Sequence, residues 1–221
     1  NGREANLDRV LARGCWTPVE RFGVAQGWSA GPADADGAFN VLWEGVVQAR
    51  VCWTLMGEHN RQNAIAAIAA ARHAGVPAAV AIDALSRFEN VKRRMEVRGT
   101  EHGITVYDDF AHHPTAIATT LEGLRHKVGQ QRILAVLEPR SNTMKLGVMK
   151  AALPASLAAA DQVYCYGANL GWDAAEALAP LGDKARVFDD LDQLVNQLVG
   201  DARSGDQVLV MSNGGFGGIH E

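Results

Sequence analysis

Few cysteines, no excess of basic charge and no long apolar run set the first limits on this 221-residue sequence. Its three cysteines, Cys15, Cys52 and Cys165, lie far apart without a CxxC pair, which gives neither a disulfide framework nor a zinc site and favours the reducing cytoplasm. A net charge of −4 offers no basic surface for nucleic acid. The longest fully apolar run, residues 64–71, has eight residues, whereas a membrane span needs ~20, and no signal peptide is visible. We therefore expect no nucleic-acid or membrane partner.

Two nucleotide-binding signatures are also missing. No GxxxxGK[ST] phosphate loop occurs, and the terminal GGFGG neither fits GxGxxG nor precedes a visible helix. The sequence begins at Asn1 without methionine and ends directly after a glycine-rich loop. We expect it to be a fragment of a longer protein.

The pattern of apolar residues changes near Asn90, which predicts two domains, residues 1–90 and 91–221. The first is expected to hold helices at residues 4–13, 60–73 and 77–88, strands at 17–22, 39–42, 45–49 and 51–55, and a loop at 31–37. The second is expected to alternate helices with strands at residues 95–98, 104–107, 133–137, 162–166, 185–188 and 207–211. This alternation predicts an α/β fold with a mostly parallel sheet covered on both faces.

The segment YDDFAHHPTAI places two carboxylates and two imidazoles between an expected strand and an expected helix. Pro114 is typical of the first turn of a helix. Polar groups at the carboxyl end of a strand lie where open α/β sheets bind ligands. Two other interpretations stay open, a solvated loop with an aspartate capping the helix and a metal-dependent hydrolase. The hydrolase would use Asp108, Asp109, His112 and His113.

Two more expected strands end in polar segments. The strand at 133–137 is followed by Glu138, Pro139, Arg140, Ser141 and Asn142, and the last strand by Ser212, Asn213 and Gly214. Arg140 is a natural clamp for a carboxylate or a phosphate, because a guanidinium matches their oxygens in pairs. The glycines after Asn213 let backbone N–H groups approach a ligand.

Asn60 and Asn63 are three residues apart near the start of an expected helix and therefore share a face. A carboxamide offers a donor and an acceptor side by side, which matches the N6 and N7 edge of adenine. The alternative is a capping asparagine and a polar surface residue. Arg93 and Arg94 precede an expected strand, so only one of them would reach a phosphate, and surface charge at a domain junction is the alternative.

Three segments, GEHNRQNAIAA, YDDFAHHPTAI and LEPRSNTMKLG, followed by VLVMSNGGFGGIH, resemble the Mur ligase superfamily of ATP-dependent amide-forming enzymes. The resemblance covers essentially all 221 residues and is strongest to members that join L-Ala-γ-D-Glu-meso-diaminopimelate, the murein tripeptide, to UDP-N-acetylmuramate in peptidoglycan recycling. It implies that residues 1–90 are the last part of a central ATP-binding domain and that residues 91–221 are a Rossmann-like C-terminal domain. The phosphate loop and the Mg²⁺ ligands would lie upstream, so the fragment alone is expected to be inactive.

The resemblance also implies a role for each matched residue. His59, Asn60 and Asn63 match an ATP-binding motif in which the asparagines read adenine, and Asp109 matches an aspartate that holds the ribose hydroxyls. Arg94 matches an arginine that reaches the terminal phosphates. His112 and His113 would border the place where the acyl phosphate meets the amine. The incoming peptide is expected to be held by Arg140, Ser141, Asn142, Ser212, Asn213 and Gly214.

The implied reaction uses ATP and Mg²⁺ to phosphorylate the lactyl carboxylate of UDP-N-acetylmuramate. The peptide amine then displaces phosphate to form an amide. A non-catalytic module that binds a nucleotide or a peptide is the alternative.

Overall fold

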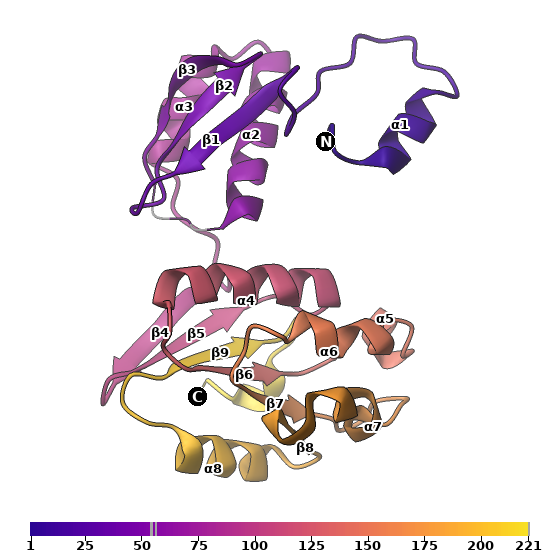
Figure 1. Cartoon of the computed structure of the whole chain (residues 1–221), viewed down its shortest axis with the longest axis vertical. Coiled ribbons are helices and arrows are strands. Elements are labelled where there is room, and N and C mark those ends of the chain that lie inside the picture. Colours follow the sequence, from indigo (N-terminus) through magenta and orange to yellow (C-terminus); the bar gives the residue numbers. More distant parts are fainter. Residues whose placement is uncertain (54, 56, 221) are drawn as a thin grey trace. The chain divides into compact units, whose positions relative to one another are not determined.

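The computed structural model describes residues 1–53, 55 and 57–220, and the chain divides into two compact units, Asn1–Asn90 and Val91–Glu221 (Figure 1). Separate clusters of buried apolar side chains form the cores of the two units. In the described part of the chain, no helix is both long enough and apolar enough to cross a membrane.

The first unit is a three-stranded antiparallel sheet with two helices packed against it (Figure 1). Its strands follow the order β1 (Trp28–Ala33), β2 (Phe39–Trp43) and β3 (Val46–Val51), and its helices are α1 (Ala5–Leu11), α2 (Glu58–His73) and α3 (Ala78–Ser86). Phe39 and Val41 alternate along β2 into a core that also contains Ile65 and Ile68 of α2. All three helices expected from the sequence are present, with bounds that differ by up to two residues.

Three expectations for the first unit are wrong. Residues 17–22 form no strand. The expected strands at 45–49 and 51–55 are instead one strand, β3, that ends at Val51, and Thr54 lies outside the described residues. The loop expected from Gly31 to Gly37 begins only after Ala33, because Gly31 and Pro32 belong to β1. Proline is tolerated in β1 because β1 is an edge strand, where a residue without an N–H need not break the hydrogen bonding between strands.

The second unit contains a six-stranded sheet of order β4-β5-β9-β6-β7-β8. The strands are β4 (Glu96–Glu101), β5 (Ile104–Asp109), β6 (Ile133–Leu137), β7 (Gln162–Tyr166), β8 (Ala185–Phe188) and β9 (Gln207–Met211). The α-helices are α4 (Pro114–Val128), α5 (Asn142–Lys145), α6 (Leu153–Ser156), α7 (Ala174–Leu178) and α8 (Leu191–Asp201), and the short 3₁₀ helices are η1 (Lys150–Ala152), η2 (Ala179–Lys184) and η3 (Phe216–Gly218). Only the β4–β5 pair is antiparallel. The sheet is mostly parallel, which confirms the predicted fold class.

Helices cover both faces of this sheet because the chain reverses its direction across it (Figure 1). From β5 the chain passes through α4 to β6 and then outward to β8, and the helices of this run pack on one face. It returns through α8 to β9, which inserts between β5 and β6, and α8 packs on the other face. Since parallel crossovers are right-handed, a reversal of direction puts the returning helix on the opposite face. Accordingly, β6 and β9 are buried along their whole length.

The six expected strands of the second unit are all present. The bounds of β6, β7, β8 and β9 are those predicted from the sequence. The strand β5 continues to Asp109, and β4 begins at Glu96. The later start of β4 leaves Arg93, Arg94 and Met95 outside any strand, so the expectation that Arg93 and Arg94 alternate as strand neighbours does not apply.

Leu209, in the middle of β9, is fully buried, whereas Leu146 is 78% exposed. We expect Leu209→Ala to lower the free energy of unfolding by about 2–5 kcal/mol, because it removes buried apolar atoms and leaves a cavity. The same change at Leu146 should alter it by no more than about 0.5 kcal/mol. Urea unfolding of both variants checks this, and equal losses would contradict the assignment of β9 to the centre of the sheet.

Candidate functional site

The carboxyl ends of three neighbouring strands form one edge of the second unit's sheet. Asp109 at the end of β5 pairs with Met211 at the end of β9, which in turn pairs with Leu137 at the end of β6. The Ser212 N–H donates to the Asp109 carbonyl at 3.2 Å, and the Glu138 N–H donates to the Met211 carbonyl at 3.1 Å. We call the loops that start here, residues 108–113, 138–142 and 212–215, the rim.

The rim coincides with a topological switch point of the sheet. The chain leaves β5 toward α4 on one face, whereas it leaves β9 toward η3, whose Phe216 packs in the core of the other face. Open α/β sheets bind ligands in the crevice outside the strands at such a point. The fold therefore places the three polar segments found in the sequence where a ligand site is expected.

Ser212 and Glu138 link two of the rim loops. The buried Ser212 hydroxyl donates to Glu138 Oε2 at 2.6 Å and accepts from the Gly214 N–H at 3.0 Å. The structure thus gives the Ser212 side chain partners inside the rim, and its contact with peptide stays a prediction. Sequence reasoning assigned no role to Glu138, although an acidic residue directly after a buried strand was the available signal.

Asp109 is only 3% exposed, and both of its carboxylate oxygens accept hydrogen bonds from the protein. Oδ1 accepts from the Ala111 N–H at 2.8 Å and from the Thr120 hydroxyl at 3.3 Å, and Oδ2 accepts from the Met95 N–H at 2.8 Å. This carboxylate joins the start of β4, the loop after β5 and α4. The geometry supports a structural role directly, and the binding of ribose by Asp109 stays a prediction.

Asp108 is equally buried and forms an ion pair with Arg93. Arg93 Nε lies 3.2 Å from Asp108 Oδ2, and its Nη2 donates to the Ser212 carbonyl at 2.6 Å. His220 Nε2 lies 3.4 Å from Asp108 Oδ1, although no aligned hydrogen bond forms between them. Arg93 therefore fastens the start of the unit to the ends of β5 and β9.

Arg94, which the sequence assigns to the terminal phosphates, is exposed. Its guanidinium carbon lies 5.6 Å from the ring centre of Phe110, a distance typical of a cation–π contact. The guanidinium carbon of Arg93 lies 5.5 Å from the centre of the same ring, and the two arginines differ in that Arg93 is part-buried and paired with Asp108 whereas Arg94 is exposed.

His112 and His113 make different hydrogen bonds. The Phe110 carbonyl can only accept, so the 2.8 Å contact with His112 Nδ1 assigns the ring proton to Nδ1 and leaves a lone pair on Nε2 of the neutral ring. The Ala116 N–H donates to His113 Nδ1 at 3.4 Å, which makes His113 the N-cap of α4. The cap is therefore a histidine and not the aspartate considered from the sequence.

Burial lowers the pKa of His113, and the neighbouring His112 lowers it further. A neutral His113 suits its position, because only a deprotonated Nδ1 accepts the cap hydrogen bond and because the start of a helix disfavours positive charge. His112, whose ring lies edge-on to His113, is thus the member of the pair with a lone pair on Nε2 available for proton transfer.

Arg140 is half-exposed and packs directly on the loop that follows β9. A Cβ added at Gly214 would lie 2.7 Å from Arg140 Nη1 and 2.8 Å from its Cδ, so a larger residue at this position would make the Arg140 side chain move. Glu138 Oε1 lies 3.8 Å from Arg140 Nη1. The predicted clamp residue is therefore held on the rim by its own loop and by the loop that follows β9.

The remaining predicted peptide-binding residues differ in their surroundings. The Ser141 hydroxyl accepts from the Met144 N–H at 3.3 Å and caps α5, and Asn142 is exposed beside it. Asn213 Oδ1 is buried and has no hydrogen-bond partner among the described residues. A buried amide oxygen of this kind gains from a donor that a ligand brings.

The predicted adenine-binding residues lie on α2 in the first unit. Helix α2 begins at Glu58, two residues before the expected start, so His59, Asn60 and Asn63 all lie within its first two turns. Asn60 is half-buried and Asn63 is exposed. Their contact with a nucleotide stays a prediction.

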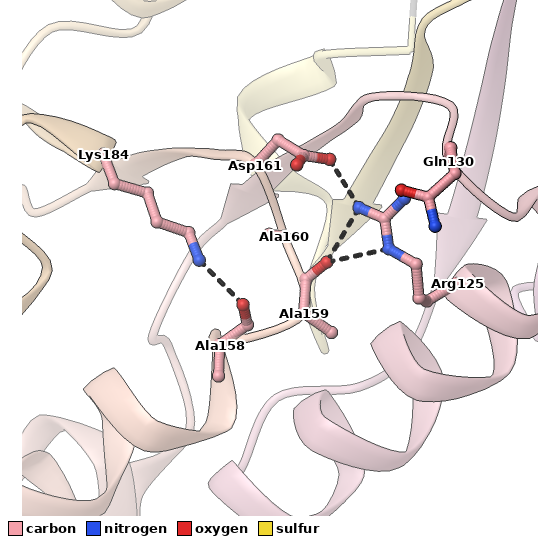
Figure 2. Close-up of a pocket in the computed structure, with 7 residues that line it drawn as sticks. All are labelled: Arg125, Gln130, Ala158, Ala159, Ala160, Asp161 and Lys184. Carbon is pink, nitrogen blue, oxygen red and sulfur yellow. Dashed lines mark hydrogen bonds and ion pairs between the residues drawn. The ribbon is translucent and has the colours of Figure 1, made fainter.

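A surface pocket of about 420 Å³ lies elsewhere on the second unit (Figure 2). It lies near the amino ends of β6, β7 and β8, the edge opposite the rim, and its lining residues are Arg125, Gln130, Ala158, Ala159, Ala160, Asp161 and Lys184. Arg125 binds Asp161 and the carbonyls of Ala159, Gly129 and Gln131, and Lys184 donates to the Ala158 carbonyl. The cations of this pocket are thus engaged by the protein's own acceptors, and the rim is the better candidate site.

No group of three or more His, Cys, Asp or Glu side chains suited to a metal ion occurs among the described residues. Asp108, Asp109 and His113 are each directed toward protein partners, as described above. The metal-dependent hydrolase considered from the sequence therefore finds no support in the rim.

Comparison with known proteins identifies the family. A family model described as Mur ligase, glutamate ligase domain, matches residues 93–214. The UDP-N-acetylmuramate–L-alanyl-γ-D-glutamyl-meso-2,6-diaminoheptandioate ligase of Escherichia coli (strain K12) is 49% identical over 221 residues, which are 99% of this chain and 48% of that protein. The enzyme of the same name from Haemophilus influenzae is 47% identical over 99% of this chain and 49% of its own length.

A solved structure gives the same result. A crystal structure of a murein peptide ligase from Psychrobacter arcticus 273-4 matches with a TM-score of 0.75 and 39% identity, over 98% of this chain and 48% of that chain. This chain therefore spans about half the length of the relatives that it matches.

The His113 cap predicts a pH dependence of stability. A histidine whose pKa is lowered by folding stabilises the fold fully above the pKa of an unfolded histidine, about 6.5, and this contribution is lost as the pH falls toward the folded value. His113→Asn should keep a capping acceptor and remove the titration. Urea unfolding between pH 7.5 and 5 should therefore show a weaker loss of stability in the variant, and identical pH profiles would rule out His113 as the cause.

Proposed function

This chain belongs to the Mur ligase family, and on that premise we propose that the protein of which it forms about half is an ATP-dependent peptide ligase. The proposed reaction joins L-Ala-γ-D-Glu-meso-diaminopimelate to UDP-N-acetylmuramate. Identities of 49% and 47% to ligases of that name support this choice of substrates. The observation that carries the proposal is the rim, where three polar loops gather at the switch point of the sheet.

The chemistry has two steps, and both build negative charge. A carboxylate oxygen of UDP-N-acetylmuramate attacks the terminal phosphorus of ATP, and ADP leaves. The amine of the tripeptide then attacks the acyl carbon, and phosphate leaves from a tetrahedral intermediate while the amine loses a proton. Fixed positive groups and hydrogen-bond donors stabilise such developing charge.

The chain offers separate groups for nucleotide and phosphate. Asn60 and Asn63, with His59 beside them, are proposed to bind the adenine of ATP, and Asp109 is proposed for its ribose. Arg94 is proposed to contact the terminal phosphates, where a guanidinium forms paired charge-assisted hydrogen bonds. The described residues hold no cluster of three or more His, Cys, Asp or Glu side chains suited to Mg²⁺.

The histidines and Arg140 are proposed to act on the peptide. His112 Nε2 has the lone pair needed to accept a proton from the attacking amine, whereas His113 Nδ1 is committed to α4. Arg140 is proposed to bind a peptide carboxylate, with Asn142, Asn213 and the loop at Ser212 and Gly214 around it. The buried oxygen of Asn213 supports this placement, because a peptide N–H would satisfy it.

A direct assay tests the proposal. The full-length protein, incubated with ATP, Mg²⁺, UDP-N-acetylmuramate and the tripeptide, should form UDP-N-acetylmuramyl-tripeptide together with ADP and phosphate. The 221-residue chain alone is the control, since it contains no GxxxxGK[ST] sequence and should form no product. Ligation of L-alanine in preference to the tripeptide would contradict the proposed substrate.

The clamp role of Arg140 has a matched pair of test variants. Gly214→Ala should displace the Arg140 side chain, because the new Cβ would lie 2.7 Å from Nη1, whereas Gly215→Ala meets nothing within 4 Å. We expect Gly214→Ala to raise the KM for the tripeptide and to leave the KM for ATP unchanged. Gly215→Ala should change neither constant.

Direct replacement of Arg140 should follow the same pattern with larger effects. Arg140→Ala is expected to weaken the free energy of peptide binding by about 2–5 kcal/mol if the ion pair between Arg140 and the peptide carboxylate is buried in the complex. Arg140→Lys should recover part of this, because it keeps the charge and loses the paired geometry. Steady-state kinetics with peptide and ATP varied separately measure both, and equal changes in the two KM values would defeat the clamp assignment.

A further inference from the structure

We propose that Asp108 and Asp109 are positioning residues that together hold Arg94 in place on the rim. The two aspartates fasten the residues on either side of Arg94, Asp108 through the Arg93 side chain and Asp109 through the Met95 N–H. This inference rests on the phosphate-binding role proposed above for Arg94.

The first attachment is the Arg93 side chain. Its Nε lies 3.4 and 3.2 Å from the two oxygens of Asp108, and its Nη2 donates to the Ser212 carbonyl at 2.6 Å. The backbone of Arg93 is held as well, since its carbonyl accepts from the Phe110 N–H at 2.8 Å and its N–H donates to Glu96 Oε2 at 2.8 Å. Arg93 is therefore tied to β4, β5 and the loop after β9.

The second attachment is the Met95 N–H, which donates to the buried Oδ2 of Asp109 at 2.8 Å. The other oxygen of Asp109 is bound by Ala111 and by Thr120 of α4, so this acceptor is itself fixed by two further segments. A carboxylate that is buried and hydrogen-bonded on both oxygens has little freedom to move. Met95 is thus attached to a rigid point of the sheet.

The backbone around Arg94 requires such attachments. Arg93 and Met95 have φ values of +59° and +52°, in the left-handed region that residues other than glycine rarely adopt. Strained residues of this kind persist where surrounding contacts hold them, and they gather at functional sites. Two of them flank Arg94, and the contacts of Asp108 and Asp109 are among those that hold them.

These contacts fix the backbone from which the exposed side chain of Arg94 extends. The Arg94 side chain lies over the ring of Phe110, the residue that directly follows the two aspartates. Phosphoryl transfer depends on positive groups placed before the reaction begins, because a small misplacement costs a large part of the rate. Asp108 would act on the reaction through Arg94 without contact with the substrate, and Asp109 would act through Met95 and Arg94 in addition to the ribose contact proposed above.

One test is independent of activity. In the ¹⁵N-labelled 221-residue chain, the heteronuclear NOE of the Arg94 amide should be as high as those of β4 and β5. Asp108→Asn should lower it, because Arg93 loses its ionic partner. Asp83→Asn is the control, since it removes the partner of an exposed Asp–Arg pair, Asp83–Arg87, in the first unit. An Arg94 NOE that is unchanged in Asp108→Asn, with the variant folded, would overturn the proposal.

A kinetic cycle tests the effect on the reaction. In the full-length ligase, Asp108→Asn should lower kcat on the order of tenfold to a hundredfold and leave the KM for ATP unchanged. In an Arg94→Ala background the same change should have little further effect, since residues that act as a unit are not additive. Full additivity would overturn the proposal. If Arg94→Ala alone leaves kcat unchanged, the phosphate role of Arg94 is wrong, and the NMR result decides whether the aspartates hold the segment.

A substitution at Asp109 distinguishes the positioning role from ribose binding alone. Asp109→Asn should lower kcat if the carboxylate acts through Met95 and Arg94, whether or not loss of the ribose contact also raises the KM for ATP. A raised KM for ATP with an unchanged kcat would instead support the ribose contact and would remove Asp109 from the positioning pair.

Discussion

The parallel pairing of β5, β9 and β6 is the constraint on which the candidate site depends. Their register aligns Asp109, Met211 and Leu137, so the residues that follow each strand are neighbours although they are far apart in sequence. The position of β9 between β5 and β6 also creates the switch point, because the chain leaves neighbouring strands toward opposite faces. Without that insertion the same polar motifs would end on strands with no crevice between their loops.

Hydrogen bonds and an ion pair between polar side chains then hold the aligned loops together. Ser212 connects the loop after β9 to Glu138 after β6, and Arg93 connects the start of the unit to Asp108 and the Ser212 carbonyl. The Ser212 hydroxyl and the carboxylates of Asp108 and Asp109 each have protein partners, and a satisfied buried polar network gives rigidity. The exposed groups, Arg94 and Arg140, are carried by residues next to these fixed points.

The sequence predicts the second unit better than the first for a physical reason. Strands β6 and β9 are buried on both faces, so they are continuous apolar runs with clear ends, and their bounds follow from composition. Strand β1 is an edge strand containing Gly31 and Pro32, residues that in isolation indicate a loop. The rim residues were identifiable because they follow the apolar runs directly. The sequence did not show which of their side chains face inward. The partners of Asp109, for example, include Met95 and Thr120, which come close to it only in the completed sheet.

The burial of Asp108 and Asp109 is better explained by the contacts that these carboxylates make than by a contribution to the stability of the fold. Replacing buried ionic groups with apolar ones is often neutral or stabilising, so an ion pair such as Arg93–Asp108 is weak evidence for a contribution to folding. Both aspartates instead receive donors from the short segment of Arg93, Arg94 and Met95, which departs from strand geometry and adopts left-handed φ values. An apolar replacement would fill the same space and would leave that segment without the directional contacts that set its path. The acidic pair therefore determines where the rim carries the positive charge of Arg94, and this links the burial of the two aspartates to the proposed chemistry.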